Sequence, residues 1–308
     1  MTASISERSA TAPVSPAIGC RAAAVMAAAG VALGFSTNLA KLADQWGLPG
    51  DWFLVASAGG ATALLGLYAL TRGERVGLSP RRLEYYAIAG LVGVALPNYL
   101  GFLAAPRIGA GFVALSFAFP PLLTYLGALA LGMQRFRWRA MTGALLSLAG
   151  VAILAAGKLA EPDADRAWIA ATMAIPLSLA VGNLYRTIRW PAGATPEELA
   201  PGTLAAATAM AGVAALAGAA PGDWPPAATL TPPVAGLCVA QSVAFAAFFG
   251  LFFVLQKIGG PMATSLVGSI GAAAGTLLAV AMLGESPPAG LLPASALILI
   301  GIWLVVRE

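Results

Sequence analysis

The sequence contains no histidine, few charged residues and two cysteines. Without histidine, the chain lacks the commonest general base, metal ligand and proton switch near neutral pH. Cys20 and Cys238 lie in separate apolar segments without CxxC spacing, so we interpret both as packing residues and expect neither a disulfide nor a metal site. No phosphate-binding loop ending in Gly-Lys-Ser/Thr occurs, so we expect no cofactor and no direct use of ATP.

Charge is scarce because most of the chain is apolar. Asp, Glu, Lys and Arg make up 10% of the 308 residues, whereas an average soluble domain carries about 25%. Hydrophobic residues make up 59%, and the mean hydropathy is +0.84. Ten membrane spans of about 20 residues would use about 200 residues, close to this apolar share. The composition therefore predicts an all-α, polytopic membrane protein with little material outside the bilayer.

Ten apolar runs are each long enough to cross about 30 Å of hydrocarbon. The first five cover residues 19–41, 52–71, 84–104, 107–131 and 138–157. The second five cover residues 168–187, 201–219, 233–255, 262–283 and 288–306. These runs divide the chain into a disordered cytoplasmic tail over 1–16, a first five-helix repeat over 17–158 and a second five-helix repeat over 166–308.

The basic residues indicate the orientation of these spans. With the N-terminus in the cytoplasm, 13 of the 17 lysines and arginines, Arg186 among them, fall at cytoplasmic ends. This is the positive-inside bias of membrane proteins. It accounts for the sequence pI near 9.3 without invoking nucleic acid. We therefore expect ten transmembrane helices with both termini in the cytoplasm.

Short local matches relate the two halves of the chain. The matched segments are Asn38–Lys41 with Asn183–Arg186, Tyr99–Phe102 with Phe248–Leu251, and Leu131–Gly132 with Leu283–Gly284. Five helices per half is an odd number, so the second half would be inverted in the membrane relative to the first. Inverted repeats in transporters place the substrate near the midplane, between the halves.

Polar side chains are costly in hydrocarbon unless they face other helices or water. They concentrate in the first, third, fourth, sixth, eighth and ninth apolar runs, which we expect to line a central cavity braced by the other four. The candidate substrate-binding residues are Ser36, Thr37, Asn38, Asn98, Tyr99, Ser116, Phe119, Asn183, Tyr185, Gln241, Phe245, Phe248, Ser265 and Ser269. The alternative for a hydroxyl is a bond to its own helix backbone, and for an aromatic ring it is packing. The amides are the stronger candidates because a primary amide satisfies itself less easily.

Proline and glycine add expectations about helix shape. Four prolines inside apolar runs each remove a helix hydrogen bond and favour a kink, and we interpret them as hinges, with a static buried kink as the alternative. These candidate hinge residues are Pro97, Pro120, Pro121 and Pro176. The pairs Gly30/Gly34 and Gly271/Gly275, each spaced four apart, predict close packing of the first and ninth helices.

Several segments resemble the EamA-type members of the drug/metabolite transporter superfamily. They are Gly34–Lys41, Ala110–Leu115 followed by Pro120, and Leu283–Glu285. In the first half, Met133 follows Leu131–Gly132, so the acid equivalent to Glu285 is replaced. The resemblance implies two EamA-like repeats in a bacterial-type inner (plasma) membrane. Among the members, the chain is most similar to bacterial amino-acid exporters, including the aromatic amino-acid exporter.

Cavity chemistry favours transport over catalysis. No acid or base falls in the middle of an apolar run and the serines have no evident base partner, so we expect no intramembrane enzyme. Together with the resemblance, this predicts a secondary transporter that exports amino acids, aromatic and other neutral ones, or similar small neutral or zwitterionic metabolites by alternating access. The alternatives are an efflux carrier for hydrophobic or cationic drugs, a channel-like facilitator and a structural protein. The expected partners are a small-molecule substrate and the lipid bilayer, with no metal, nucleic acid or protein partner.

Overall fold

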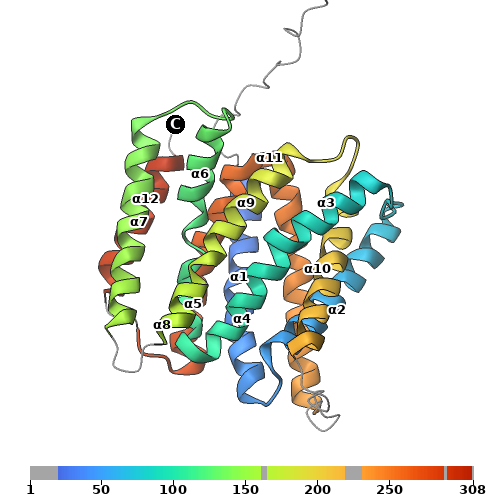
Figure 1. The fold of residues 1–308 in the computed structure, drawn as a ribbon, viewed down its shortest axis with the longest axis horizontal. Helices are drawn as coiled ribbons and strands as arrows, with labels where there is room; N and C mark the ends of the chain where they lie inside the picture. Colours follow the sequence, from blue (N-terminus) through green and yellow to red (C-terminus); the bar gives the residue numbers. More distant parts are fainter. Residues whose placement is uncertain (1–19, 161–164, 219–230, 288–289, 307–308) are drawn as a thin grey trace, which may run out of the picture.

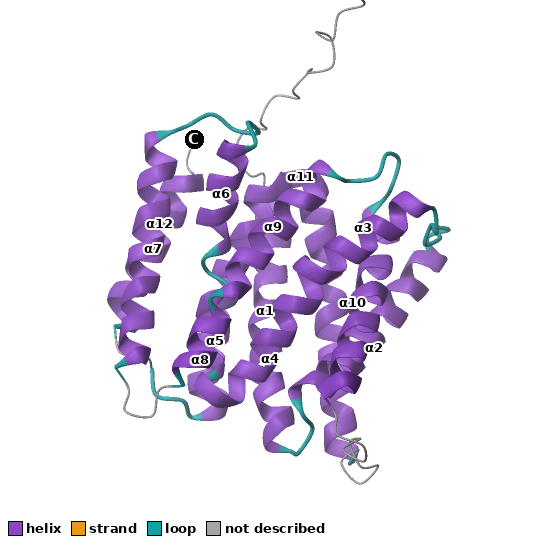
Figure 2. Ribbon diagram, viewed as in Figure 1, coloured by secondary structure: helices purple, strands orange, loops and turns teal. Residues whose placement is uncertain are grey.

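The computed structural model describes residues 20–160, 165–218, 231–287 and 290–306, and within these ranges the chain forms helices and no strands. The helices run side by side in one bundle (Figure 1, Figure 2). They are α1 (Cys20–Gln45), α2 (Gly50–Thr71), α3 (Pro80–Gly90), the π-helical turn η2 (Leu91–Ala95), α4 (Leu96–Ile108), α5 (Ala110–Ser116), α6 (Pro120–Ala130), α7 (Trp138–Leu159), α8 (Arg166–Thr172), α9 (Ala174–Ile188), α10 (Pro196–Gly218), α11 (Pro232–Leu283) and α12 (Leu291–Val306).

Eight segments of the described ranges are long and apolar enough to cross a membrane. They coincide with eight of the ten predicted runs, and the chain is a multi-pass helical membrane protein. The other two runs fold as α7 and α12, which are not among the eight, so the count of ten spans stays a prediction. The predicted tail over 1–16 lies outside the described residues.

Large apolar side chains on the outer surface of the bundle fit a lipid surround. Leu67, Val213 and Leu277 are 62%, 68% and 70% exposed. A soluble monomer rarely exposes contiguous apolar surface on this scale. The outer surface of the bundle therefore suits contact with the hydrocarbon of a membrane.

Several of the predicted spans are interrupted. α3 passes through η2 into α4, α5 is separated from α6 at residues 117–119, and α8 is separated from α9 at Met173. α11 changes direction at Gly260, whose φ of 65° and ψ of −167° are not helical. We call residues 232–259 the first limb of α11 and residues 261–283 the second limb.

The candidate hinge prolines lie next to these interruptions. Pro97 is the second residue of α4, Pro120 and Pro121 open α6, and Pro176 is the third residue of α9. Proline is tolerated in the first turn of a helix because the N–H groups there have no acceptor within the helix. Each proline thus stands at an interruption of a helical segment, and its role as a hinge stays a prediction.

Pairs of helices from the two halves pack side by side. α7 pairs with α12 at one edge of the bundle, and α2 pairs with α10 toward the other (Figure 1). α1 lies against the second limb of α11, where a Cβ on Gly34 would stand 2.8 Å from the backbone nitrogen of Gly275. A Cβ on Gly271 would likewise meet Leu33 at 2.8 Å. The predicted close glycine packing of these helices is confirmed.

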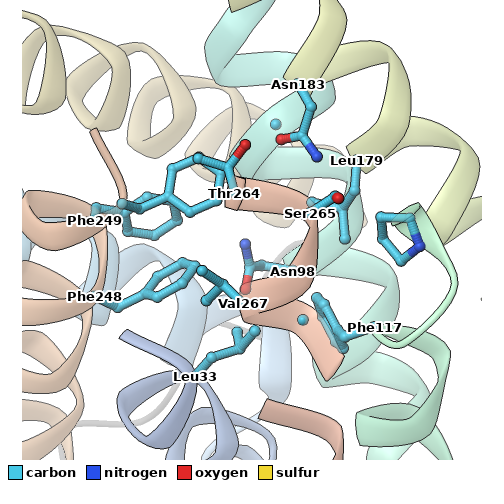
Figure 3. A pocket seen from close by; sticks show the side chains of 14 residues that line it. Leu33, Asn98, Phe117, Leu179, Asn183, Phe248, Phe249, Thr264, Ser265 and Val267 are labelled. Atoms are coloured by element: carbon cyan, nitrogen blue, oxygen red, sulfur yellow. The ribbon is translucent and has the colours of Figure 1, made fainter. Parts of the chain in front are cut away.

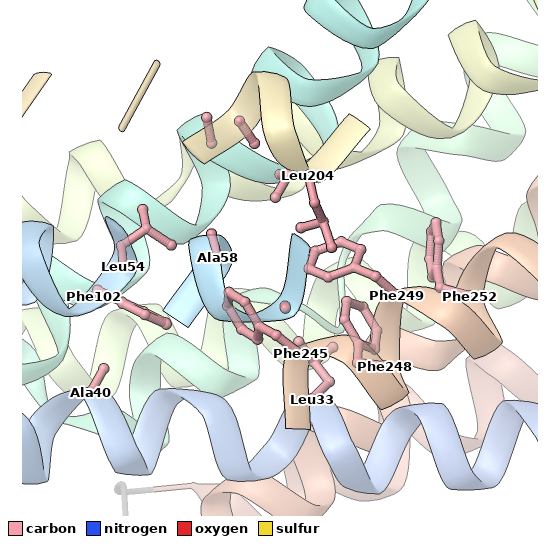
Figure 4. Packing of buried hydrophobic residues seen from close by; sticks show 14 of the residues in the cluster. Leu33, Ala40, Leu54, Ala58, Phe102, Leu204, Phe245, Phe248, Phe249 and Phe252 are labelled. Carbon is pink, nitrogen blue, oxygen red and sulfur yellow. The ribbon is translucent and has the colours of Figure 1, made fainter. Parts of the chain in front are cut away.

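Aromatic rings from the first limb of α11 fill the core between α2, α4 and α10 (Figure 4). The Phe245 ring lies 5.9 Å from Phe102 and 5.5 Å from Phe249, and Phe248 lies 4.6 Å from Phe249. Such tilted and edge-on pairs contribute about 0.5–1.5 kcal/mol beyond the area they bury. The first limb of α11 therefore presents a continuous phenylalanine face to the rest of the protein.

Candidate functional site

A small pocket lies where the interrupted helices meet (Figure 3). Its walls come from α1, η2 and α4, the α5–α6 break, α9 and both limbs of α11, which correspond to the first, third, fourth, sixth, eighth and ninth apolar runs. The lining residues are Leu33, Gly93, Asn98, Phe117, Pro120, Leu179, Asn183, Phe248, Phe249, Phe252, Thr264, Ser265, Val267 and Gly268. The volume of about 30 Å³ has room for about two waters. An amino acid would fit only after the helices move apart.

Five of the sequence-predicted residues line this pocket. Asn98, Asn183 and Ser265 supply polar groups, and Pro120 and Phe248 supply apolar surface. Figure 3 shows the Phe248 and Phe249 rings on one side of the pocket and the Phe117 ring on the other. The pocket is thus an aromatic slot with a few hydrogen-bonding groups.

Asn38 and Gln241 are buried between helices, away from this lining. The Asn38 Nδ2 donates to the backbone oxygens of Gly34, at 2.9 Å, and Gly275, at 3.0 Å, so this amide ties α1 to the second limb of α11. The Gln241 Nε2 donates to the Ser36 Oγ at 2.6 Å and ties α1 to the first limb. These amides join helices, as is common in membrane bundles.

The remaining predicted residues also lie outside the pocket lining. Ser116 donates to the Val113 carbonyl, Tyr185 stacks on Tyr85 with ring centroids 5.9 Å apart, and Phe245 is buried among aromatic rings. The others are the half-buried Tyr99 and Phe119, which pack against apolar clusters, and the buried Thr37 and Ser269, whose hydroxyls have no hydrogen-bond partner. The prolines Pro97, Pro121 and Pro176 do not line the pocket either.

The π-helical turn η2 shapes one wall of the pocket. A π turn leaves its carbonyls without the usual helical pairing and often marks a functional site. Here the Ser178 Oγ of α9 donates to the Val92 carbonyl and the Asn98 Nδ2 donates to the Val94 carbonyl, both at 2.7 Å. The Ser178 bond holds η2 against α9, and the Asn98 bond joins η2 to α4.

The burial of Arg186 beside the pocket is a feature that the sequence did not predict. We expected this arginine at a cytoplasmic helix end, but its side chain is only 1% exposed. Its Nη2 donates to the Asn183 Oδ1 at 2.8 Å, and its Cζ lies 4.9 Å from the centre of the Phe252 ring. Hydropathy could not reveal this burial, because Arg186 falls one residue from the end of an apolar run. The signal was the match of Asn183–Arg186 to Asn38–Lys41.

An ion pair closes the bundle at the end where α1 finishes. The Lys41 Nζ lies 2.5 Å from the Glu285 Oε1, and their side chains are 18% and 16% exposed. The Ala110 and Gly111 N–H groups, at the start of α5, donate to the same carboxylate at 2.8 and 3.0 Å. Burial alone would raise the pKa of Glu285, but the Lys41 and backbone hydrogen bonds outweigh it and hold the pKa below its ordinary value. We call this cluster the end latch.

The sequence around Glu285 explains how the latch is built. Gly284 ends α11 in the left-handed conformation, with φ of 62°, which glycine adopts at no steric cost. Gly109 precedes α5 with φ of 93°, and a Cβ there would stand 3.2 Å from the Glu285 Oε2. Two glycines thus bring the carboxylate to the unpaired N–H groups of a helix start, where negative charge is stabilised.

A second, larger cavity of about 300 Å³ lies among α2, α10 and the first limb of α11. It is lined by Leu65, Tyr68, Pro196, Glu197, Ala200, Ala246, Ala247, Gly250, Leu251 and Val254. We favour the smaller pocket as the functional site because it holds four polar side chains and borders a buried arginine. Among the described residues, no group of three histidine, cysteine or acidic side chains could hold a metal ion.

Comparisons with known proteins agree with this architecture. Residues 21–156 match the EamA-like transporter family. One solved crystal structure aligns with a TM-score of 0.67 and 22% sequence identity, over 92% of this chain and 96% of that chain. In all, 28 solved chains match, whereas the search of curated proteins gave no match. At this identity the structural likeness establishes the fold alone.

Proposed function

We propose, from the premise that residues 21–156 belong to the EamA-like transporter family, that this protein is a secondary transporter that exports amino acids. Aromatic and other neutral amino acids are the expected solutes. The membrane is a bacterial-type inner membrane with both chain termini in the cytoplasm. The two halves, 17–158 and 166–308, act as inverted repeats around the pocket.

The composition of the pocket is the observation that carries this proposal. Phe117, Phe248 and Phe249 give it flat apolar surface suited to an aromatic side chain. Asn98 and Asn183 offer amide groups suited to the charged ends of a zwitterion. A pocket with aromatic walls and a few fixed polar groups is the usual form of a small-molecule site.

Alternating access requires the two sides of the bundle to open in turn, and here different contacts hold the end latch and the pocket. The end latch joins α1, α5 and the end of α11 through an ion pair and two backbone hydrogen bonds. The pocket, by contrast, is lined by Asn183 of α9 and by Thr264, which lies just after the break in α11. A solute larger than the present volume of about 30 Å³ must part these helices to enter. The interruptions around the pocket provide places where segments can rotate without unfolding a helix.

Counterflow in proteoliposomes tests the proposal. Vesicles with the full-length protein are loaded with unlabelled phenylalanine and diluted into labelled phenylalanine. A carrier gives transient, saturable accumulation of label, whereas a channel equilibrates label without overshoot. Labelled tetraphenylphosphonium tests the hydrophobic-cation alternative. If phenylalanine, leucine and alanine all show no counterflow while tetraphenylphosphonium does, the amino-acid proposal is wrong.

The pocket assignment makes a separate prediction about Asn183. Asn183→Ala removes a pocket amide and frees Arg186 from its hydrogen bond. We expect phenylalanine counterflow to fall at least about fivefold, a change of about 1 kcal/mol in the interaction with the solute, with normal membrane insertion. Gln45→Ala is the matched control because it removes an exposed amide at the end of α1. Equal counterflow in both variants would contradict the assignment.

A further inference from the structure

We propose that Arg186 is the carboxylate-binding residue of this transporter, so that the solute is an organic acid or amino acid whose carboxylate pairs with the guanidinium. The inference deepens the proposed function and rests on it only for the pocket being the transport site. Arginine suits the role because its planar fork matches two carboxylate oxygens at once.

The first support is a buried charge without a counter-ion. The Arg186 side chain is 1% exposed. Within the described residues the ion pairs are Lys41–Glu285 and Arg82–Glu198, and neither involves Arg186. Its Nε is buried without a hydrogen-bond partner. Burying an uncompensated charge costs several kcal/mol. A ligand that brings negative charge would remove that cost.

The second support is position. Three groups that touch or border the guanidinium line the pocket: Asn183 accepts from Nη2, Phe252 lies under Cζ, and a Cβ on Gly93 would stand 3.0 Å from Cζ. Because Gly93 has no side chain, only a backbone segment separates the guanidinium from the pocket there. A modest shift of α9 against η2 would bring the guanidinium into the pocket.

The third support comes from comparing the two ends of the bundle. Asn38–Lys41 and Asn183–Arg186 occupy matching places in the two halves, as do Leu283–Gly284 and Leu131–Gly132. Gly284 and Gly132 share the left-handed conformation, with φ of 62° and 67°. Glu285 follows Gly284 and pairs with Lys41, but Met133 follows Gly132. The sequence therefore omits the acid that would correspond to a partner for Arg186.

These observations set the chemical class of the solute. A carboxylate meeting Arg186 side-on would accept from Nε and from one N–H of Nη2, and the second N–H of Nη2 can keep the bond to Asn183. The phenylalanine face then receives an apolar side chain. A cationic solute would face the guanidinium without a compensating acid. The pocket therefore selects carboxylates and disfavours organic cations.

Calorimetric binding to the purified full-length protein tests the inference with three probes of similar shape. 3-Phenylpropionate carries only the carboxylate, phenethylamine only the amine, and L-phenylalanine both. We expect the wild type to bind 3-phenylpropionate and phenylalanine at least tenfold more tightly than phenethylamine. Arg186→Gln should weaken both carboxylates at least tenfold and leave phenethylamine unchanged or tighter. Arg189→Gln is the matched control, an exposed arginine at the end of the same helix, and should change nothing.

Arg186→Lys keeps the charge, so it still tests the inference if the glutamine variant misfolds. It should fold, retain the preference for carboxylates and bind them at least threefold more weakly than the wild type, because an ammonium does not offer the paired geometry. Unchanged carboxylate affinity in Arg186→Gln, or no carboxylate binding by the wild type, overturns the inference. Binding of 3-phenylpropionate without amino-acid counterflow would refute the proposed function and support the role of Arg186. Amino-acid counterflow with unchanged probe preference in Arg186→Gln would do the reverse.

Discussion

Removing Glu285 should loosen the end latch by an amount that can be worked out from its contacts. In Glu285→Ala, the Lys41 ammonium loses its ion pair and the Ala110 and Gly111 N–H groups lose their acceptor. Hydrogen bonds to a charged group contribute about 1.5–3 kcal/mol each. The two side chains are 18% and 16% exposed, so water can partly replace the lost contacts. We therefore expect a loss near the lower end of the buried-pair range, about 3 kcal/mol.

Thermal unfolding in detergent measures this loss. A destabilisation of about 3 kcal/mol should lower the Tm by about 6–12 °C. Glu285→Gln keeps one oxygen acceptor and removes the charge, so its Tm should fall about half as far. Glu84→Gln, at an exposed acid, is the control and should leave the Tm unchanged. If the Tm of Glu285→Ala stays within about 2 °C of the wild type, the latch does not stabilise the observed conformation.

The pH dependence provides an independent check on the same residue. The pKa of Glu285 lies below its ordinary value of 4.5, so the folded protein favours the ionised form. Its contribution to stability is therefore complete above about pH 4.5 and disappears as the pH falls through the lowered pKa. The Tm difference between wild type and Glu285→Gln should stay constant from pH 7 to about pH 5 and shrink below. A difference that grows on acidification would contradict the assigned role.

Two further variants test the packing of α1. Asn38→Ala removes an amide that bonds two backbone carbonyls, and should cost about 1 kcal/mol, or a Tm decrease of about 2–4 °C relative to the Gln45→Ala control. Gly275→Val should cost about 1–3 kcal/mol by overpacking, because the first carbon added would stand 2.7 Å from the Ala114 Cβ. The matched control is Gly212→Val, where nothing lies within 4 Å. A Gly275→Val protein as stable as its control would show that α11 can move away from α5 and α1 at no cost in stability.

Hydropathy could predict the helices because each backbone polar group in hydrocarbon must be satisfied within its own helix. It could not predict where the helices break. Pro120 and Pro176 indicated that the helices are irregular there. Proline occurs both at helix starts and at kinks, so the sequence does not distinguish the two. The break at Gly260 depends on a backbone conformation that only the folded chain displays.

The candidate site could be predicted only at the level of helices. Polar side chains pointed to the six runs that surround the pocket, yet Asn38 and Asn183 look alike in sequence and have different surroundings in the structure. Asn38 bonds across a glycine contact, where backbone carbonyls are within its reach, whereas Asn183 faces a gap opened by the interrupted helices. Which amide meets a carbonyl and which meets a cavity is decided by packing between distant segments.

In the proposed inverted repeat, Lys41 and Arg186 hold matching positions, and the absence of one acid gives the two ends of the bundle different tasks. Lys41 is paired with Glu285 and so stabilises closure at its own end. In the proposed repeat, Met133 stands where the acid corresponding to Glu285 would be. The Arg186 charge is therefore available to a solute in the pocket. A bound carboxylate would then take the place of the missing acid and stabilise α9 against η2 as the latch stabilises α1 against α5. On this reasoning the solute itself completes the second ion pair, so that closure around the pocket depends on a carboxylate being there.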